Sequence, residues 1–448
     1  MLQKIASIDI HKKVLMVVVA TTFRKSEEEI DEAAGTEEAI EYECRRFGTG
    51  NGERMNLVSW LGERKVTEVV MESTAQYWKP IWMDLEPHFP KLHLAQAYSN
   101  RAPRGRKNDF NDAKRLARRL LASELMLSFV PDGEQRLWRT LTRSKLQLTR
   151  ERVRLQSQME ALLEEARIKL TSVISDLFGA SGRRILEALA RGEKDPVKLA
   201  ELGDDRLKCT TQELEDALTG HVDPVQQGVL AMNMERLAMY DNHIARTDGL
   251  VAVALKKHQD AVIRIAEIPG FGVDSAQQLI AEIGVDAKTF KSAGNFCSWV
   301  GVCPGQQESA EKNTSSRSAK GNRYVRRILT QAAQAAVKKK RSFFQSLFHR
   351  LLPRLGWKAA IWAIAHRLGC LVWKILHDGV RYIEKGEETT PQAKKRRLQK
   401  LKQALRKLGY EATLTPVQAT AETAQTAKTP KNAKTAKGAQ TAQTAQTV

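Results

Sequence analysis

The sequence predicts an α/β domain that is followed by an all-α remainder. Runs of Ile and Val around short polar turns lie near the N-terminus, which is typical of strands. From residue 132 onward, apolar residues recur mainly at helical spacing. The chain has 448 residues, of which 42% are hydrophobic, and this length predicts two or three domains with substantial cores.

We expect the first domain to span residues 1–126. It begins with two β-branched runs, at 4–10 and 14–20, around the polar turn His11-Lys12-Lys13, which predicts a hairpin. Two more strands are expected, at 66–71 and 92–97. Helices are expected at 36–47, 55–64, 77–86 and 109–126.

Residues 127–260 are predicted to form a helical connector. Leucines recur every seven residues, at Leu141, Leu148, Leu155 and Leu162, as in one seam of a coiled coil. The companion heptad position is polar, with Ser144, Glu151 and Gln158. Two interpretations therefore stay open: a coiled coil between two chains, and an amphipathic helix that packs within its own chain.

Residues 261–385 are predicted to form an all-α C-terminal domain. Pro269-Gly270-Phe271-Gly272 lies between two apolar helices, which is typical of a helix-hairpin-helix. Glycines there allow a tight turn whose backbone N–H groups can approach a phosphate. A plain helix–helix connection is the alternative.

The last segment, 386–448, differs sharply in composition. Its first part is a basic helix at 394–407, and a tail of Thr, Ala, Gln and Lys follows from 413 to 448. Such a tail lacks the apolar surface that offsets the entropy of ordering, so we expect it to be disordered.

The charge of the chain points to a polyanionic partner. Lys and Arg number 72 against 52 acidic residues, a formal charge of +20. Cations that neutralise phosphates release condensed counterions, so DNA or RNA is the expected partner, although charge does not distinguish between them. We found no apolar run of 18 residues and no signal peptide, so we expect a cytoplasmic protein with no membrane partner.

The five cysteines form no Cys-x-x-Cys pair. They are Cys44, Cys209, Cys297, Cys303 and Cys370. Their spacing supports neither a zinc ribbon nor the disulfide framework of a secreted protein, and no His/Cys cluster in the sequence indicates zinc.

Four carboxylates lie where a metal site could form. Asp9 is in the first strand and faces away from its apolar neighbours, and Glu72 ends another strand. Asp109 and Asp112 stand three residues apart near a helix start, which puts them on one helix face. Taken singly, such residues are often turn or cap residues.

Together, the four carboxylates match the arrangement of the ribonuclease-H-like fold. In that fold, carboxylates at strand ends and on a helix hold one or two divalent ions for phosphoryl transfer. Oxygen ligands suit Mg²⁺ or Mn²⁺.

Three segments of the N-terminal domain resemble the motifs of the DEDD transposases of bacterial insertion sequences, the family that includes the Piv-type DNA invertases. The segments are Ile8-Asp9-Ile10-His11-Lys12, Met71-Glu72-Ser73-Thr74 and Arg106-Lys107-Asn108-Asp109-Phe110-Asn111-Asp112-Ala113-Lys114. The resemblance implies a RuvC-like domain whose four acids are Asp9, Glu72, Asp109 and Asp112, with Mg²⁺ or Mn²⁺ as cofactor. It also implies nucleic-acid contacts by Arg106 and Lys107.

The C-terminal half resembles the second domain of the same family. The matching features are Trp299-Val300-Gly301, Pro304, a serine, and Lys320-Gly321-Asn322 followed by Arg326-Arg327. The family's nucleophilic serine falls on Ser309. The sequence departs from the commonest motif because Ala310 follows in place of glycine, and Ser315 is therefore the reserve candidate.

Eight residues are the expected nucleic-acid contacts: Arg106, Lys107, Gly270, Gly272, Lys320, Arg323, Arg326 and Arg327. Arginine and lysine side chains suit phosphate, although the same cations on a solvated helix face would only increase solubility.

The resemblance implies a transposase or site-specific DNA recombinase that forms a phosphoserine–DNA intermediate. It also implies a structured guide RNA, a homodimer or homotetramer, and a nucleoid-associated protein of the bacterial cytoplasm. Two alternatives remain from the residues themselves: a metal-dependent junction nuclease without a covalent intermediate, and a non-catalytic nucleic-acid-binding scaffold.

Overall fold

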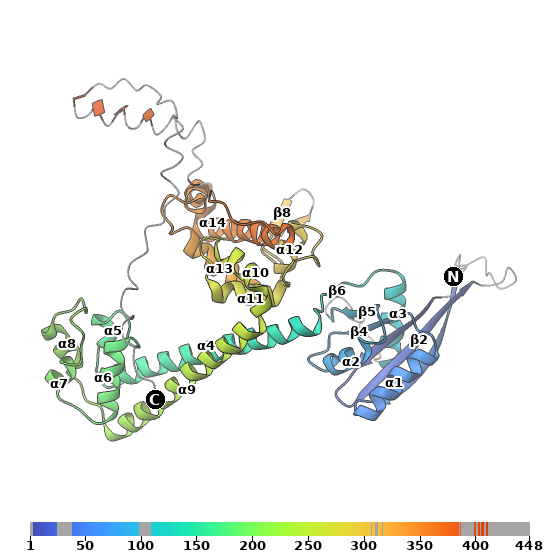
Figure 1. Cartoon of the computed structure of the whole chain (residues 1–448), viewed down its shortest axis with the longest axis horizontal. Helices are drawn as coiled ribbons and strands as arrows, with labels where there is room; N and C mark the ends of the chain where they lie inside the picture. Colours follow the sequence, from blue (N-terminus) through green and yellow to red (C-terminus); the bar gives the residue numbers. More distant parts are fainter. Residues whose placement is uncertain are drawn as a thin grey trace, which may run out of the picture.

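The computed structural model describes residues 3–24, 38–97, 109–305, 307–309, 312–315, 317–384 and 386, with short pieces at 398–399, 402–403, 405–406 and 409–410. At residues 24, 38, 307–309 and 312–315 it describes the backbone alone. Arg106, Lys107 and the predicted disordered tail lie outside the described residues. Figure 1 shows a sheet domain, a helical rod with a small cluster at its far end, and a second helical domain beside the rod.

The N-terminal domain contains one mixed sheet with the strand order β3-β2-β1-β4-β5-β6. Its strands are β1 (Lys4–Ile10), β2 (Val14–Arg24), β3 (Glu38–Gly48), β4 (Glu68–Glu72), β5 (Leu92–Ala95) and β6 (Leu127–Ser128). Strands β1, β4 and β5 are parallel, and the other neighbouring pairs are antiparallel. The predicted hairpin and both further strands are present, and β6 carries the sheet just past the expected boundary at residue 126.

The prediction of a helix at 36–47 is wrong, because residues 38–47 belong to strand β3. β3 pairs with β2 along its whole length, from Val14 opposite Gly48 to Arg24 opposite Glu38. Ile40 and Tyr42 on alternate positions pack toward the core. The glutamates of this edge strand are more typical of a helix than of a strand. Pairing with the long strand β2 nevertheless determines the conformation of this segment.

Helices cover both faces of the sheet. Helices α1 (Asn51–Glu63) and α2 (Trp78–Leu85) pack on the face that carries Ile8 and Ile10. Helix α3 (Asp109–Leu121) packs on the opposite face. Strand alternation therefore sends the residues between these isoleucines toward α3.

The rod consists of α4 (Gly133–Glu165) and α9 (Pro224–Ala254), which lie along each other (Figure 1). At its far end they share a core with the short helices α5 (Leu170–Val173), α6 (Ala180–Ala190), α7 (Pro196–Ala200) and α8 (Thr211–Leu218). Leu155 and Leu162 of the predicted seam contact that core, and Leu141 contacts the core of the second helical domain. Intramolecular packing thus covers much of the seam.

The second helical domain is built from eight further elements. They are η2 (Lys256–His258), α10 (Gln259–Ala266), α11 (Val273–Ile283), α12 (Ala293–Val300), β7 (Gln307–Ser309), β8 (Lys312–Ser315), α13 (Arg323–Ala336) and α14 (Phe343–Asp378). Its core also includes Trp138 of α4 and Val251 of α9, so the rod and this domain share one hydrophobic cluster.

Helix α14 is long and apolar enough to span a membrane, judged by length and composition only. Half of its most apolar window is buried inside the structure. The helix breaks at Gly356, whose φ of 73° lies in the left-handed region. Residues of α14 such as Ile364 and Leu368 are fully buried in the domain core.

Candidate active site

Helix α3 packs along strand β1 with a regular spacing of opposing residues. This packing positions the first and third predicted acids. The Ser7 hydroxyl donates to the carbonyl of Ala113 over 2.7 Å. Asp9 comes two residues after Ser7 on β1, and Asp109 comes four residues before Ala113 on α3. These two acids lie next to each other. Two residues of a strand span about 6.6 Å, and four residues of a helix span about 6 Å. Residues with this spacing therefore stay opposite each other along β1 and α3.

The second acid follows from the pairing of β1 with β4. These parallel strands are in register with Ile8 opposite Met71. Asp9 and Glu72 come next on each strand, so the two carboxylates leave the sheet at the same edge. Backbone pairing alone thus brings together residues that are 63 positions apart in the sequence.

The fourth acid, Asp112, belongs to the turn of α3 that faces β4. Val70 of β4 packs against Leu116 of α3. Glu72 shares the face of Val70, and Asp112 precedes Leu116 by one helical turn. Asp112 also accepts a hydrogen bond from Arg115 over 2.8 Å.

His11 joins this cluster, although it was not among the predicted site residues. Its Nε2 lies 3.2 Å from an oxygen of Asp9 and 3.6 Å from an oxygen of Asp109. The three side chains offer ligand atoms that all lie within 4.8 Å of one another. Glu72 and Asp112 are not part of this tightest group.

The environment of the His11 ring suits a cation. Nε2 is buried and has no hydrogen bond of good geometry, so the two carboxylates approach it at ion-pair distances only. A buried ring nitrogen beside two carboxylate oxygens is a donor set that can coordinate a divalent metal. In the sequence, His11 directly follows the strand that carries Asp9 and belongs to the same motif segment as Asp9.

The predicted nucleophile lies on a different domain. Ser309 ends β7 and pairs with Lys312 of β8, and Ser315 pairs with Gln307. In Figure 1 the hairpin stands on the helical domain, on the side away from the rod and separate from the sheet. Within the described residues of one chain, the acids and the hairpin are therefore apart.

The ends of this hairpin segment are held close together by glycines. A Cβ on Gly305 would lie 2.2 Å from the carbonyl oxygen of Arg317. A Cβ on Gly321 would lie 2.4 Å from the carbonyl of Val300. Only glycine fits such approaches, so Gly305 and Gly321 define the base of the segment that carries Ser309.

The cations predicted to contact phosphate divide into two groups. Lys320 and Arg323 are exposed. Arg326 donates to the carbonyls of Val300 and Ala319, over 3.3 and 2.9 Å. Arg327 donates to Gln278 over 2.5 Å, and burial lowers the pKa of its guanidinium.

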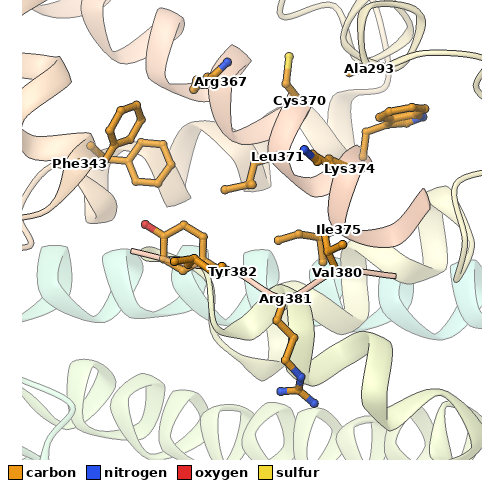
Figure 2. Close-up of a pocket in the computed structure, with 13 residues that line it drawn as sticks. Ala293, Phe343, Arg367, Cys370, Leu371, Lys374, Ile375, Val380, Arg381 and Tyr382 are labelled. Carbon is orange, nitrogen blue, oxygen red and sulfur yellow. The ribbon is translucent and has the colours of Figure 1, made fainter. Parts of the chain in front are cut away.

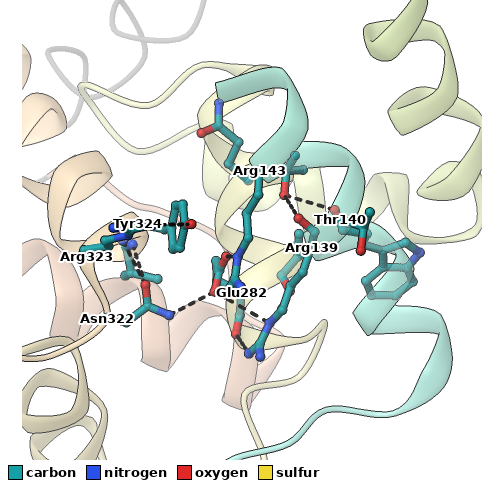
Figure 3. Close-up of polar contacts among 12 residues, drawn as sticks. Arg139, Thr140, Arg143, Glu282, Asn322, Arg323 and Tyr324 are labelled. Atoms are coloured by element: carbon teal, nitrogen blue, oxygen red, sulfur yellow. Dashed lines mark hydrogen bonds and ion pairs between the residues drawn. The ribbon is translucent and has the colours of Figure 1, made fainter. Parts of the chain in front are cut away.

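Figure 3 shows a buried network that joins the rod to this motif. Glu282 of α11 is 1% exposed and accepts two hydrogen bonds from Arg143 of α4, at 2.7 and 2.9 Å. Asn322 donates to the same carboxylate over 2.9 Å and caps α13 through its side-chain oxygen. Arg139 also lies 3.6 Å from Glu282, and burial lowers the pKa of Arg139 to about 10.

The two glycines of the α10–α11 turn have different surroundings. Gly270 has a φ of +93°, and a Cβ there would lie 2.2 Å from the carbonyl oxygen of Ala332 on α13. Gly272 has open space around its α-carbon, and its N–H donates to the Ser275 hydroxyl over 2.9 Å. Gly270 thus permits close packing of the turn on α13, whereas Gly272 faces open space.

Two family profiles match the chain. The profile of DEDD transposases of the IS110 type matches residues 26–168, which include Glu72, Asp109 and Asp112 but not Asp9. The profile described as the transposase IS116/IS110/IS902 family matches residues 263–349, which include Ser309 and the Lys320–Arg327 segment.

Curated relatives agree with these profiles. An uncharacterized 42 kDa protein of insertion element IS900 from Mycobacterium paratuberculosis is 27% identical over 157 residues, which are 34% of this chain and 39% of that protein. The transposase for insertion sequence element IS1328 from Yersinia enterocolitica is 25% identical over 282 residues, which are 61% of this chain and 72% of that protein. The chain thus spans well under half the length of the first relative and almost three quarters of the second.

Proposed function

Because the chain belongs to the DEDD transposases of the IS110 family, we propose that it cleaves and rejoins DNA strands as the transposase of an insertion sequence. The observation that carries the proposal is the convergence of Asp9, Asp109 and His11, with ligand atoms within 4.8 Å, at the sheet edge where Glu72 also emerges. The formal charge of +20 supports a nucleic-acid substrate.

The sheet domain would be a RuvC-like, ribonuclease-H-like domain. Its support is the strand order, in which β1 lies in the centre between antiparallel β2 and parallel β4. Helix α3 on one face carries Asp109 and Asp112 at its start. This arrangement exposes carboxylates at one edge, where a phosphodiester could approach.

We propose that Asp9, Glu72, Asp109 and Asp112 hold Mg²⁺ or Mn²⁺, with His11 as an additional ligand. The fit rests on Asp9, Asp109 and His11, whose ligand atoms lie within 4.8 Å of one another, and on the buried His11 nitrogen. A bound divalent ion would neutralise charge on the scissile phosphate. The acids themselves would orient that ion and exclude misplaced phosphates by repulsion.

Ser309 would attack the scissile phosphorus through Oγ. A phosphoserine bond forms, the bond from phosphorus to one strand end breaks, and the leaving strand oxygen takes up the proton that the serine loses. A hydroxyl from another strand then attacks phosphoserine and releases Ser309. No phosphodiester energy is lost, because each broken bond is replaced by one of the same type.

Because the hairpin and the acids are separate in one chain, the working site would combine the acids of one copy with Ser309 of another. This requires a homodimer or homotetramer, for which the rod offers a long surface (Figure 1). Exposed apolar side chains along the rod, such as Val153 of α4 and Val253 of α9, support such an assembly.

The partners would be the DNA of the element ends and target, together with a structured guide RNA. Exposed Lys320 and Arg323 are the best-placed phosphate contacts near the hairpin. The α10–α11 pair would act as a helix-hairpin-helix, with the open turn at Gly272 toward phosphate. The reaction would take place at the nucleoid in the cytoplasm, without a membrane partner.

Trapping of a covalent protein–DNA adduct tests the mechanism. Wild type with an element-end DNA should give a denaturation-resistant adduct, and Ser309→Ala should give none, while Ser315→Ala keeps it. Persistent DNA cleavage by Ser309→Ala without adduct would instead indicate hydrolysis by the acidic site. Adduct formation by Ser309→Ala but not by Ser315→Ala would move the nucleophile to Ser315.

The guide RNA needs its own measurement. RNA that copurifies with the full chain would be sequenced and compared with the DNA that flanks the gene. A discrete RNA encoded beside the gene is the expected result, and a random sample of cellular RNA would contradict the guide.

A further inference from the structure

A second group of metal-ligating side chains lies in the helical domain, far along the chain from the acids. Cys297 of α12 is fully buried, and His366 and Cys370 stand one turn apart on α14. Their ligand atoms all lie within 4.8 Å of one another. No spacing rule reveals this group, because 69 residues separate Cys297 from His366.

The distances agree with tetrahedral coordination. The sulfurs of Cys297 and Cys370 are 3.6 Å apart, and the Cys370 sulfur is 4.0 Å from Nδ1 of His366. With Zn–S of about 2.3 Å and Zn–N of about 2.0 Å, a tetrahedral site needs about 3.8 Å between sulfurs and about 3.6 Å from sulfur to nitrogen. The observed pairs differ from these values by a few tenths of an ångström.

The backbone around the group permits this approach. Gly369 lies between the two α14 ligands, and a Cβ there would come within 3.0 Å of the Cys297 sulfur. Glycine at this position therefore lets the thiol of α12 lie directly against α14. The close packing places the Cys297 sulfur where it can share an ion with Cys370.

A further thiol lies in the segment that follows α12. Cys303 packs against the same core, but its sulfur does not belong to the group whose ligand atoms lie within 4.8 Å of one another. It also lies shortly before β7, the strand that ends at Ser309. An ion held here would connect α12 and α14 to the base of the hairpin segment.

One of the three ligands also borders a cavity. Cys370 lines a cavity of about 600 Å³, together with Leu371, Lys374 and Tyr382 (Figure 2). Two thiols and an imidazole are soft or borderline ligands that select Zn²⁺ over Mg²⁺. The donor set is thus chemically distinct from the carboxylates of the sheet domain.

We propose that Cys297, His366 and Cys370 form a structural zinc site, and that Cys303 moves in to complete the four ligands when the ion binds. The site would stiffen the helical domain beneath the hairpin that carries Ser309. It is independent of the divalent ion at the acidic cluster.

Metal analysis of the full-length chain, purified under reducing conditions without chelator, tests the site. About one zinc ion per chain is expected, falling on the order of tenfold in Cys370→Ser and in His366→Ala. Cys44→Ser and Cys209→Ser are matched controls that remove cysteines elsewhere and should keep the zinc. Asp9→Asn should keep it too, which separates this site from the acidic cluster.

Cobalt substitution gives a readout that does not depend on variants that could misfold. Wild-type protein loaded with Co²⁺ should show a thiolate-to-cobalt charge-transfer band, which carboxylates and imidazole alone do not give. Absence of this band, or zinc content unchanged in both variants, would overturn the proposal. A Cys297–Cys370 disulfide in the isolated protein, with no metal bound after reduction, would overturn it as well.

Discussion

His11 is the residue where the structure adds most to the acidic cluster. Its ring nitrogen lies between oxygens of Asp9 and Asp109, at 3.2 and 3.6 Å. A nitrogen ligand in a carboxylate site strengthens binding of Mn²⁺ more than of Mg²⁺, because imidazole is the softer donor. His11 therefore bears directly on metal affinity.

We predict that His11→Ala weakens Mn²⁺ binding on the order of tenfold or more. Isothermal titration with Mn²⁺ measures the change. Lys12→Ala, at the exposed neighbouring position, is the control and should bind as wild type does. Equal affinity of His11→Ala and wild type would show that the ring is not a ligand.

At the scale of elements, the α10–α11 turn is held on α13 by Gly270. The positive φ and the 2.2 Å approach to Ala332 both exclude a side chain. We predict that Gly270→Ala destabilises the helical domain by roughly 2–3 kcal/mol, because strain and overpacking add. Thermal or urea unfolding measures this loss.

Gly272→Ala is the matched control for that substitution. Its Cβ would meet nothing within 4 Å, and its φ of −114° is open to any residue. Stability should stay within about 0.5 kcal/mol of wild type. If both substitutions are equally harmless, the close packing of Gly270 on α13 is not essential to the domain.

The contact between α2 and α4 should respond to pH. Arg136 donates to both oxygens of Glu86, at 2.9 and 2.6 Å, and these hydrogen bonds hold the pKa of the Glu86 carboxyl below its ordinary value of 4.5. Since the folded pKa is depressed, the ionised pair stabilises the folded state above about pH 4.5 and is lost as pH falls below that value.

Glu86→Gln should therefore lower the free energy of unfolding at pH 7. Its difference from wild type should become smaller as the pH falls through 4. Glu86 is 38% exposed, so solvent screening limits the effect to below about 1 kcal/mol. Unfolding curves of wild type and Glu86→Gln at both pH values provide the test. Glu134→Gln, on the exposed first turn of α4, is the control. A stability difference that does not change with pH would rule out titration of Glu86 as its source.

At the scale of the whole molecule, the separation of the hairpin from the acids predicts complementation between chains. In a mixture of Asp9→Ala and Ser309→Ala chains, a mixed dimer contains one site with intact acids and an intact serine. Random mixing should restore strand cleavage to about a quarter of wild type. Each variant alone should be inactive.

The matched control mixes Asp9→Ala with Glu72→Ala. Both changes fall in the acidic half of the site, so no mixed dimer has a complete set, and activity should stay absent. If the first mixture is also inactive although its chains associate, the acids and Ser309 must act within one chain.

The elements that carry the acids could be predicted because their signals are local. Two β-branched runs predicted β1 and β2, and the motif residues Asp109 and Asp112 begin α3 as expected. The edge strand β3 could not be predicted, because its charged sequence becomes a strand only through pairing with β2.

The sequence by itself determined the family, and it predicted the four carboxylates and the candidate serine, since each depends on short runs of neighbouring residues. Only the tertiary structure decided that His11 joins the acids, that Gly270 packs on α13 and that Cys297 meets His366 and Cys370. The physical reason is that these contacts join residues far apart in the chain or depend on where a side chain turns. The packing of strands and helices sets the positions of these side chains. A short stretch of sequence does not predict that packing.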